Sequence, residues 1–431
     1  MKKEFYIIMA AQALSSLADN ALFIAVISLI IELDGPAWII PLMKWSFALS
    51  YVVLAPFVGI ISDKFPKGHV MFYSNLIKIL GCLLVIFIPT LDFDLDVKIY
   101  LVSLSYSLVG IGAAIYSPAK YGIVTEILPP KMLVQGNSWI EGLTVLSIIV
   151  GTCLGGYLIT PNTSSFLINQ AYLSYFTSSA SETAVFVILH IYISASIFNL
   201  MIKKTNIVYT IQNNNTIEIF KNFYKSILIM YKDELGRVSL FVTTIFWGAS
   251  ASLQLIVIKW GQIHLGYSID QTSILMGIVA IGTIIGATAV AKYLRLSQAL
   301  STIPIGITMG LLMLLMPFIQ TETNAYLLLI ITGILAGFFV VPMNALLQHR
   351  GYKLLSAGHS IAVQNFNEQL NILIMISFYT ILVWFNVDID NIIIIYGMIV
   401  SISMSYCLLY IHTNKKLYKK LLAKLDKEEQ N

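Results

Sequence analysis

The sequence predicts an all-α polytopic membrane protein with twelve transmembrane helices, because of its composition, the spacing of its apolar segments and the distribution of its basic residues. Of the 431 residues, 58% are hydrophobic and 11% are charged. A soluble domain has about 25% charged residues, so the composition excludes a soluble enzyme, a disordered protein and a nucleic-acid binder. A span needs about 20 apolar residues, and a chain of this length therefore accommodates about twelve spans with their loops.

Apolar segments separated by polar breaks define the individual spans. They lie near 5–31, 38–62, 68–90, 99–124, 137–160, 183–202, 238–264, 271–293, 299–318, 324–348, 358–384 and 389–412. The first segment is too long for the apolar region of a cleaved signal peptide, and no small-residue cleavage site follows it. We therefore expect the first helix to be retained.

The basic residues test this topology. With Lys2 and Lys3 in the cytoplasm, 22 of the 26 basic residues fall on the cytoplasmic side, and the exceptions are Lys44, Lys78, Lys98 and Lys259. Acidic residues collect in the opposite loops, for example Asp92, Asp94 and Asp96. The positive-inside rule thus favours an even number of spans with both termini in the cytoplasm.

The longest polar break divides the chain into two halves. It predicts a six-helix half at 1–202, a linker at 203–237, a second six-helix half at 238–412 and a basic cytoplasmic tail at 413–431. Within the linker, apolar residues at spacings of three and four predict an amphipathic surface helix. Similar segments precede spans five and eleven, Gly136-Asn137-Ser138 and Gly358-His359-Ser360. We expect pseudo-symmetric halves with the substrate site between them near the bilayer midplane.

Signatures of soluble enzymes and metal sites are missing from the sequence. There is no P-loop, HExxH or GxSxG motif, and Cys82, Cys153 and Cys407 lie singly in apolar segments. Isolated thiols give neither a disulfide framework nor metal-ligand spacing. We therefore expect no catalytic residues, no metal, no cofactor and no nucleic-acid partner.

Ionisable residues inside spans are the most informative candidates, because a charge at the centre of a helix in the membrane costs about 2.5–3.5 kcal/mol on insertion scales. Asp19 and its neighbour Asn20 lie near the midplane, about 21 Å along the first helix. Lys120 follows Pro118 in the fourth span. Its depth differs from that of Asp19 by about 10 Å. An ion pair between Asp19 and Lys120 is therefore a hypothesis for one conformation only.

Further polar residues complete the candidate site. The full set of candidate substrate-binding residues is Asp19, Asn20, Tyr116, Lys120, Glu141, Gln254, Asn344, Gln348, Asn365 and Glu368. For the amides, interhelical hydrogen bonding is the alternative. Lys44, Lys78 and Lys259 are open to interpretation as site residues or as snorkelling and packing residues. Charges of both signs favour a zwitterion, or a polar solute coupled to a cation.

The loop after span two resembles the signature of the major facilitator superfamily. It reads Gly59-Ile60-Ile61-Ser62-Asp63-Lys64-Phe65-Pro66-Lys67, with Pro66 where a glycine is usual. The resemblance implies the major facilitator fold. It assigns a conformational role to Asp63, Lys64 and Lys67, which would connect helix ends through charge and helix-dipole contacts. An ordinary charged turn is the alternative.

Three longer segments resemble the bacterial lysophospholipid transporter family within that superfamily. They are Ser16-Leu17-Ala18-Asp19-Asn20-Ala21-Leu22, Tyr116-Ser117-Pro118-Ala119-Lys120-Tyr121-Gly122-Ile123, and Phe338 to Gln348 followed by Ile361-Ala362-Val363-Gln364-Asn365. The resemblance implies a flippase in the bacterial inner membrane, in contact with membrane lipids, and we expect it to be a monomer. It would move lysophospholipids, chiefly lysophosphatidylethanolamine, from the outer to the inner leaflet. It also implies a separate partner, an acyltransferase-acyl-ACP synthetase.

The same resemblance makes Asp19 and Lys120 the charged pair of the substrate pathway and adds Glu368 with Asn365. One position departs from the family, which has an arginine where this chain has Gln254. Either Lys120 alone contacts the phosphate or the substrate range has shifted. Two alternatives stay open: a proton-coupled major facilitator exporter of small amphiphilic solutes, and a polytopic lipid enzyme such as an acyltransferase.

Overall fold

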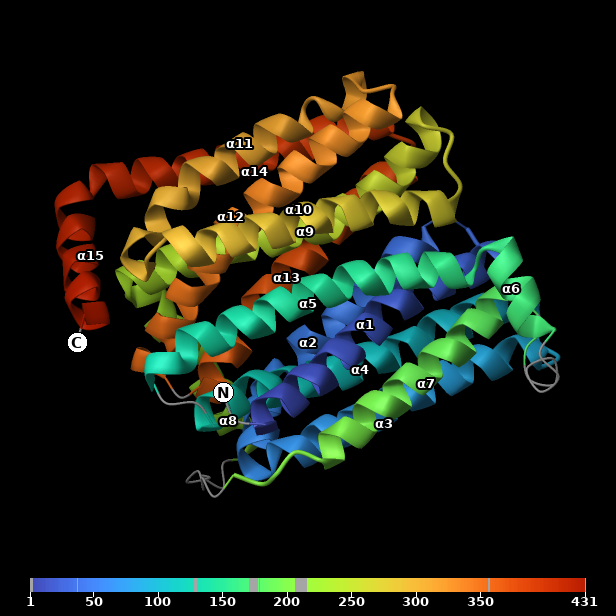
Figure 1. Cartoon of the computed structure of the whole chain (residues 1–431), viewed down its shortest axis with the longest axis horizontal. Helices are drawn as coiled ribbons and strands as arrows, with labels where there is room; N and C mark the ends of the chain where they lie inside the picture. The colour runs from blue at the N-terminus through green and yellow to red at the C-terminus, as the bar shows by residue number, and fades with distance from the viewer. Residues whose placement is uncertain are drawn as a thin grey trace.

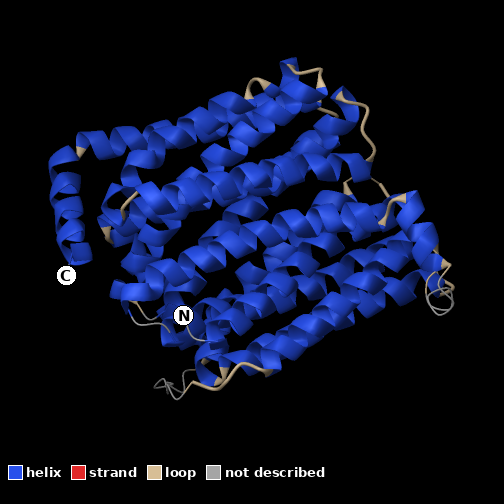
Figure 2. Ribbon diagram, in the orientation of Figure 1, coloured by secondary structure: helices blue, strands red, loops and turns tan. Residues whose placement is uncertain are grey.

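The computed structural model of the chain describes residues 3–36, 38–127, 130–169, 177, 179–205, 215–355 and 357–430. Within these ranges the protein consists of helices and loops, without a strand (Figure 2). The helices before the middle of the chain are α1 (Lys3–Glu32), α2 (Ile39–Lys64), α3 (Lys67–Phe87), η1 (Ile88–Thr90), α4 (Leu95–Ile127), α5 (Pro130–Leu158), α6 (Pro161–Ile168) and α7 (Ala180–Leu200). They are followed by α8 (Thr216–Lys232), α9 (Glu234–His264), α10 (Ile269–Tyr293), η3 (Leu296–Thr302), α11 (Ile303–Met313), η4 (Met316–Phe318), α12 (Glu322–Leu354), α13 (Ala357–Trp384), α14 (Ile389–Thr413) and α15 (Lys415–Gln430).

The membrane-spanning helices agree with the predicted spans. In the described ranges, ten helices are long and apolar enough to cross a membrane. A pair bent by 71°, Gly142–Leu158 with Pro161–Ile168, and the shorter apolar stretch Ile274–Val290 lie at the two remaining predicted spans. The protein is therefore a multi-pass, all-α membrane protein, and the twelve predicted spans are consistent with it.

Figure 1 shows the arrangement of the helices. The N-terminus, α8 and α15 lie at one end of the bundle, here called the α8 end, and α6 lies at the other, here called the α6 end. The helices before α8 contact those after it mainly through α2 against α13 and α5 against α10. These two interfaces join the first part of the bundle to the second.

The hydrophobic core is continuous at only one end of the bundle. Toward the α6 end, a single cluster contains residues from both sides of α8 in the sequence, such as Ile27 and Trp260. Toward the α8 end, the helices before and after α8 have separate cores. A small cluster that includes Phe223 and Met230 of α8 lies between them. Apolar packing thus holds the two parts of the bundle together most extensively at the α6 end.

Glycines allow some helices to approach backbone to backbone. A Cβ atom added to Gly333 on α12 would lie 1.9 Å from the Val279 carbonyl oxygen, and one on Gly286 of α10 would lie 2.0 Å from the Ile334 carbonyl oxygen. On α5, a Cβ atom at Gly151 would lie 2.4 Å from the carbonyl oxygen of Leu17. Small residues at such contacts are typical of helix pairs in membranes. The α1–α5 contact also fixes the helix that carries Asp19.

One carboxylate joins the C-terminal helix to the rest of the bundle. Glu234, at the start of α9, accepts hydrogen bonds from the hydroxyl groups of Tyr410 and Tyr418, each at 3.2 Å, and pairs with Arg237. Tyr418 lies on α15 and is 2% exposed. The C-terminal helix therefore packs against η3 and α14, and Tyr418 joins it to the start of α9.

Candidate functional site

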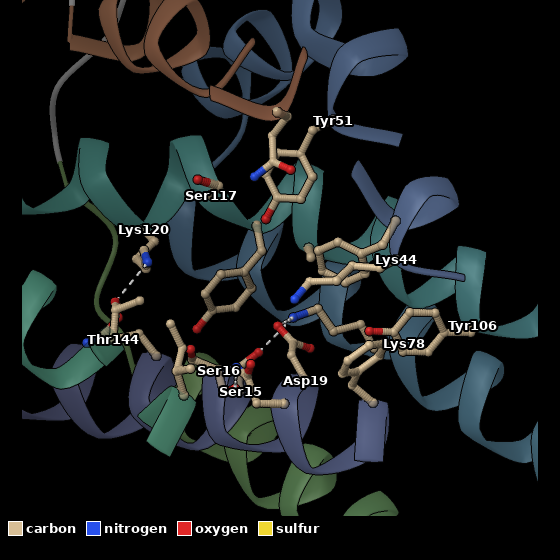
Figure 3. Close-up of a pocket in the computed structure, with 18 of the residues that line it drawn as sticks. Ser15, Ser16, Asp19, Lys44, Tyr51, Lys78, Tyr106, Ser117, Lys120 and Thr144 are labelled. Carbon is tan, nitrogen blue, oxygen red and sulfur yellow. Dashed lines mark hydrogen bonds and ion pairs between the residues drawn. The ribbon is translucent and has the colours of Figure 1, made fainter. Parts of the chain in front are cut away.

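A cavity of about 250 Å³ lies inside the bundle, between helices from both sides of α8. This volume lies just below the roughly 300–1,000 Å³ of ligand pockets, so it suits a small polar group. The lining residues come from α1, α2, α3, α4, α5, α9 and α13, and ten of them are labelled in Figure 3. The charged ones are Asp19, Lys44, Lys78 and Lys120.

Asp19 is held by an ion pair with Lys78. Its Oδ2 atom lies 2.8 Å from Lys78 Nζ, and its Oδ1 atom accepts a 2.6 Å hydrogen bond from the Tyr192 hydroxyl group. Lys78 also donates to Ser15 Oγ at 3.0 Å, and its Nζ atom lies 5.1 Å from the centre of the Tyr116 ring. A buried charge is stable only when it is paired and hydrogen-bonded, and this arrangement meets both conditions.

Lys120 occupies a different part of the cavity. Its Nζ atom donates to Thr144 Oγ1 at 3.3 Å and lies 4.4 Å from the centre of the Tyr121 ring. Thr144 in turn donates to Gln12 Oε1 at 3.4 Å. Figure 3 shows Lys120 beside Thr144, apart from Asp19 and Lys78. Lys120 and the Asp19 pair therefore contact different portions of the cavity.

Lys44 reaches across the cavity from α2 to α9. Its Nζ atom donates to Gln254 Oε1, in a short contact, and to the Ala251 carbonyl oxygen at 3.3 Å. It also lies 5.1 Å from the centre of the Phe23 ring. This contact connects one helix before α8 to one helix after it.

The charges of the cavity lining have a positive excess. The described lining has three lysine amino groups and one carboxylate, from Asp19, so basic groups outnumber acidic ones. Charges inside a low-dielectric cavity are weakly screened, so the excess favours an anionic group there. Serine and tyrosine hydroxyl groups and amide side chains provide further hydrogen-bonding positions.

Comparison with known proteins identifies the family of this chain. The Major Facilitator Superfamily model matches residues 8–374. The lysophospholipid transporter LplT of Serratia proteamaculans is 35% identical over 384 residues, 89% of this chain and 89% of that protein. LplT of Yersinia enterocolitica is 36% identical over 377 residues, 87% of this chain and 86% of that protein. This chain belongs to the lysophospholipid transporter family of the major facilitator superfamily.

A solved structure shows the same fold in a distant member of the superfamily. The crystal structure of the human organic anion transporter MFSD10 matches with a TM-score of 0.68 at 12% sequence identity, over 94% of this chain and 100% of that one. At this identity the similarity shows the fold alone. The predicted major facilitator fold is confirmed.

The cavity of this family member contains part of the predicted site. The predicted residues that line it are Asp19, Asn20, Tyr116, Lys120 and Gln254. Asn344, Gln348, Asn365 and Glu368 are not among the lining residues, and the side chain of Glu141 lies outside the described part of the structure. The assignment of these residues to the substrate therefore stays a prediction.

The predicted residues outside the lining have other contacts. Asn365 on α13 donates to Ser117 Oγ on α4 at 2.8 Å, and Ser117 lines the cavity. Glu368 accepts from Gln364 on the same helix at 2.9 Å. Asn344 is buried in α12 with an exposed fraction of 2%. Asn365 is thus linked to the cavity through Ser117.

The ion pair suggested for Asp19 and Lys120 does not form in this structure. Among the described residues, Asp19 pairs with Lys78 instead. The sequence identified Lys78 as a lysine within a span, but did not indicate its partner. Tyr192 carried no signal at all, because a tyrosine in an apolar span is ordinary. The one sequence signal for Lys78 as a site residue is its position, three helical turns into α3.

The predicted conformational residues lie at the α8 end. Lys67 pairs with Glu126 in a short contact, and Lys67 Nζ lies 4.0 Å from Asp63 Oδ1. Glu126 also accepts from Thr205. Lys64 is exposed, with its Nζ atom 5.8 Å from the centre of the Phe65 ring. Lys67 therefore connects α2, α3 and α4, and Glu126 is a member of this cluster that the sequence did not suggest.

Proposed function

We propose that this protein moves lysophospholipids, such as lysophosphatidylethanolamine, from the outer to the inner leaflet of the bacterial cytoplasmic membrane. The observation that carries the proposal is a charged cavity between the two parts of the bundle, in a chain related over most of its length to lysophospholipid transporters. The lipid changes leaflet and is not altered chemically, so the protein acts as a transporter and not as an enzyme.

The cavity supports this proposal through its charges. Lysophosphatidylethanolamine carries a phosphate and an ammonium group on one small headgroup. The lysines of the cavity would contact the phosphate, and the small volume leaves the acyl chain in the lipid or between apolar helices. Asp19 already accepts from Lys78 and Tyr192. The phosphate, rather than the amine, is therefore the part of the headgroup that we expect this conformation to bind.

Alternating access would move the headgroup across the membrane. In this proposal the six-helix halves, 1–202 and 238–412, rock around the cavity, and 203–237 links them. Asp63, Lys64 and Lys67 would influence which side is open. The termini would face the cytoplasm, because the positive-inside rule places the basic residues of 413–431 there. We infer a monomer that supplies lysophospholipid to a separate acyltransferase-acyl-ACP synthetase.

A liposome experiment tests the proposal. Purified protein would be placed in liposomes with fluorescent lysophosphatidylethanolamine, and an impermeant quencher would measure the fraction of label in the outer leaflet. We expect the wild type to speed the exchange of label between leaflets, and mass spectrometry to find the lipid unaltered. If folded wild-type protein does not increase the rate of label exchange, a proton-coupled exporter of small amphiphiles would become the better proposal. An altered lipid would indicate an enzyme.

A further inference from the structure

We propose that Lys44 and Gln254 form an anion subsite that takes the phosphate group of the transported lipid. The inference rests on the proposed function and identifies which side chains would bind the headgroup. Lys44 lies on α2 and Gln254 on α9, and both line the cavity. A bound phosphate would therefore contact both parts of the bundle.

The first argument is the charge of Lys44. In the described part of the chain its hydrogen-bond acceptors are the Gln254 side chain and the Ala251 carbonyl oxygen, and neither is a carboxylate. By contrast, Lys78 in the same cavity is paired with Asp19 at 2.8 Å. The Lys44 amino group has no counter-charge among these acceptors, so a bound anion would supply one and would stabilise its protonated form, whereas Lys78 already has its counter-charge.

The second argument is an unused donor on Gln254. An ammonium group can only donate, so the amide oxygen of Gln254 must face Lys44 and its NH₂ group must face away. This nitrogen is buried without a hydrogen-bond acceptor, in a residue that is 7% exposed. Buried polar groups nearly always have partners, so this cavity-lining donor is available to an acceptor that enters the cavity.

Phosphate chemistry fits both groups. A phosphate offers several oxygen acceptors at tetrahedral angles, enough to accept from the Lys44 ammonium and the Gln254 amide at once. It would replace the direct contact between the two side chains. Because they belong to different sides of the cavity, their separation when the bundle opens would expose one ammonium and one amide donor to the incoming headgroup.

Binding measurements on purified full-length protein test the subsite. Lys44→Gln removes the charge, and Gln254→Glu places a carboxylate against Lys44, which neutralises it and keeps the contact. We expect each to weaken lysophosphatidylethanolamine binding by about tenfold or more, the loss of one charge-assisted hydrogen bond. Lys44→Arg should keep affinity within about threefold, because it keeps the charge and donors. Lys259→Gln, an exposed lysine on the same α9, is the matched control and should change nothing.

Further ligands distinguish lipid phosphate from free phosphate. A monoacylglycerol with the same acyl chain has no phosphate, and its affinity should be equal in wild type and Lys44→Gln. Inorganic phosphate should compete weakly with the lipid. If the variants lose inorganic phosphate binding but keep lysophosphatidylethanolamine affinity, the lipid assignment is overturned.

The liposome assay separates failure of the subsite from failure of the proposed function. A wild type that moves lysophospholipid, together with folded Lys44→Gln and Gln254→Glu variants that bind and move it normally, would overturn the subsite alone. A folded wild type that moves no lysophospholipid would overturn the proposed function.

Discussion

Asp19 on α1 and Lys78 on α3 form a 2.8 Å ion pair whose lysine side chain is 1% exposed and whose carboxylate is 18% exposed. The two ends of the pair therefore differ: the ammonium is enclosed by protein, whereas the carboxylate reaches the cavity edge. Removing one partner of a buried pair leaves the other uncompensated, which is more harmful than removing both. This asymmetry gives the pair a structural role as well as a place in the cavity.

We expect Asp19→Asn to lower the free energy of unfolding by about 3 kcal/mol, because it leaves Lys78 buried without a counter-charge. Movement of lysophospholipid should also be lost. Thermal unfolding in detergent and the liposome assay measure the two effects. The double variant Asp19→Leu with Lys78→Met should recover most of the stability without recovering transport. If the double variant transports normally, the pair has no part in function.

Tyr192→Phe should destabilise the protein less than Asp19→Asn does. It removes one hydrogen bond to Asp19 and keeps the ion pair, so we expect a loss of about 1 kcal/mol of stability. A loss of stability as large as that of Asp19→Asn would contradict this prediction. It would mean that Tyr192, rather than Lys78, holds the carboxylate.

Lys120→Ala should reduce transport. Its hydrogen bond to Thr144 is long, at 3.3 Å. We expect lysophospholipid movement to fall, because one cavity cation is lost. Thr144→Val, which removes the hydroxyl group and keeps the lysine, should retain most transport. Equal losses in the two variants would show that the hydrogen bond matters and not the charge.

Gly333→Ala tests the close approach of α10 and α12. The new Cβ atom would lie 1.9 Å from the Val279 carbonyl oxygen, so the helices must separate. We expect a loss of about 1–3 kcal/mol of stability, the usual effect of overpacking. Gly142→Ala on α5 is the control, because nothing lies within 4 Å of its added Cβ atom. It should be neutral or stabilise by about 0.5–1 kcal/mol, since alanine favours the helix. Equal melting temperatures for the two variants would contradict the packing argument.

The hydrogen bond from Asn365 to Ser117 joins α13 to α4 and so crosses between the two parts of the bundle. Asn365→Leu should favour the conformation in which the two parts of the bundle are separated at the α8 end. We expect this conformation to gain about 1 kcal/mol, a shift of roughly fivefold in its population. Spin labels at Lys64→Cys and Lys353→Cys, with the native cysteines replaced, would report a larger share of long distances. Ser117→Ala should give the same shift, and the double variant no more than either alone. An unchanged distance distribution would show that this bond does not influence closure.

The sequence predicted the spans well because each depends on local composition alone. Span 389–412, for example, corresponds to α14, Ile389–Thr413. Depth along a helix was equally accessible, since each residue adds about 1.5 Å. Asp19 was placed near the middle of the first span, and in the structure it lines the cavity.

The pairing of these residues was not accessible from sequence. Which face of α3 carries Lys78 depends on how α3 packs against α1 and α7, and those contacts join residues far apart in the chain. The same limit applies to Glu368. The sequence placed Glu368 in a span, but it did not indicate the hydrogen bond that Glu368 accepts from Gln364, one turn away on the same helix. A polar residue in a span thus predicts an interaction, and tertiary packing decides whether the partner is a substrate, a neighbouring helix or the next turn.

The contacts of Glu234 have a practical consequence for measuring motion. Because Tyr410 and Tyr418 both donate to this one carboxylate, α9, α14 and α15 are fastened together at the α8 end. The C-terminal helix should therefore move as one rigid body with the second part of the bundle. A fluorophore on the exposed Lys419, paired with one near the start of α1, would report the rocking of the transporter in intact liposomes, without any label inside the membrane.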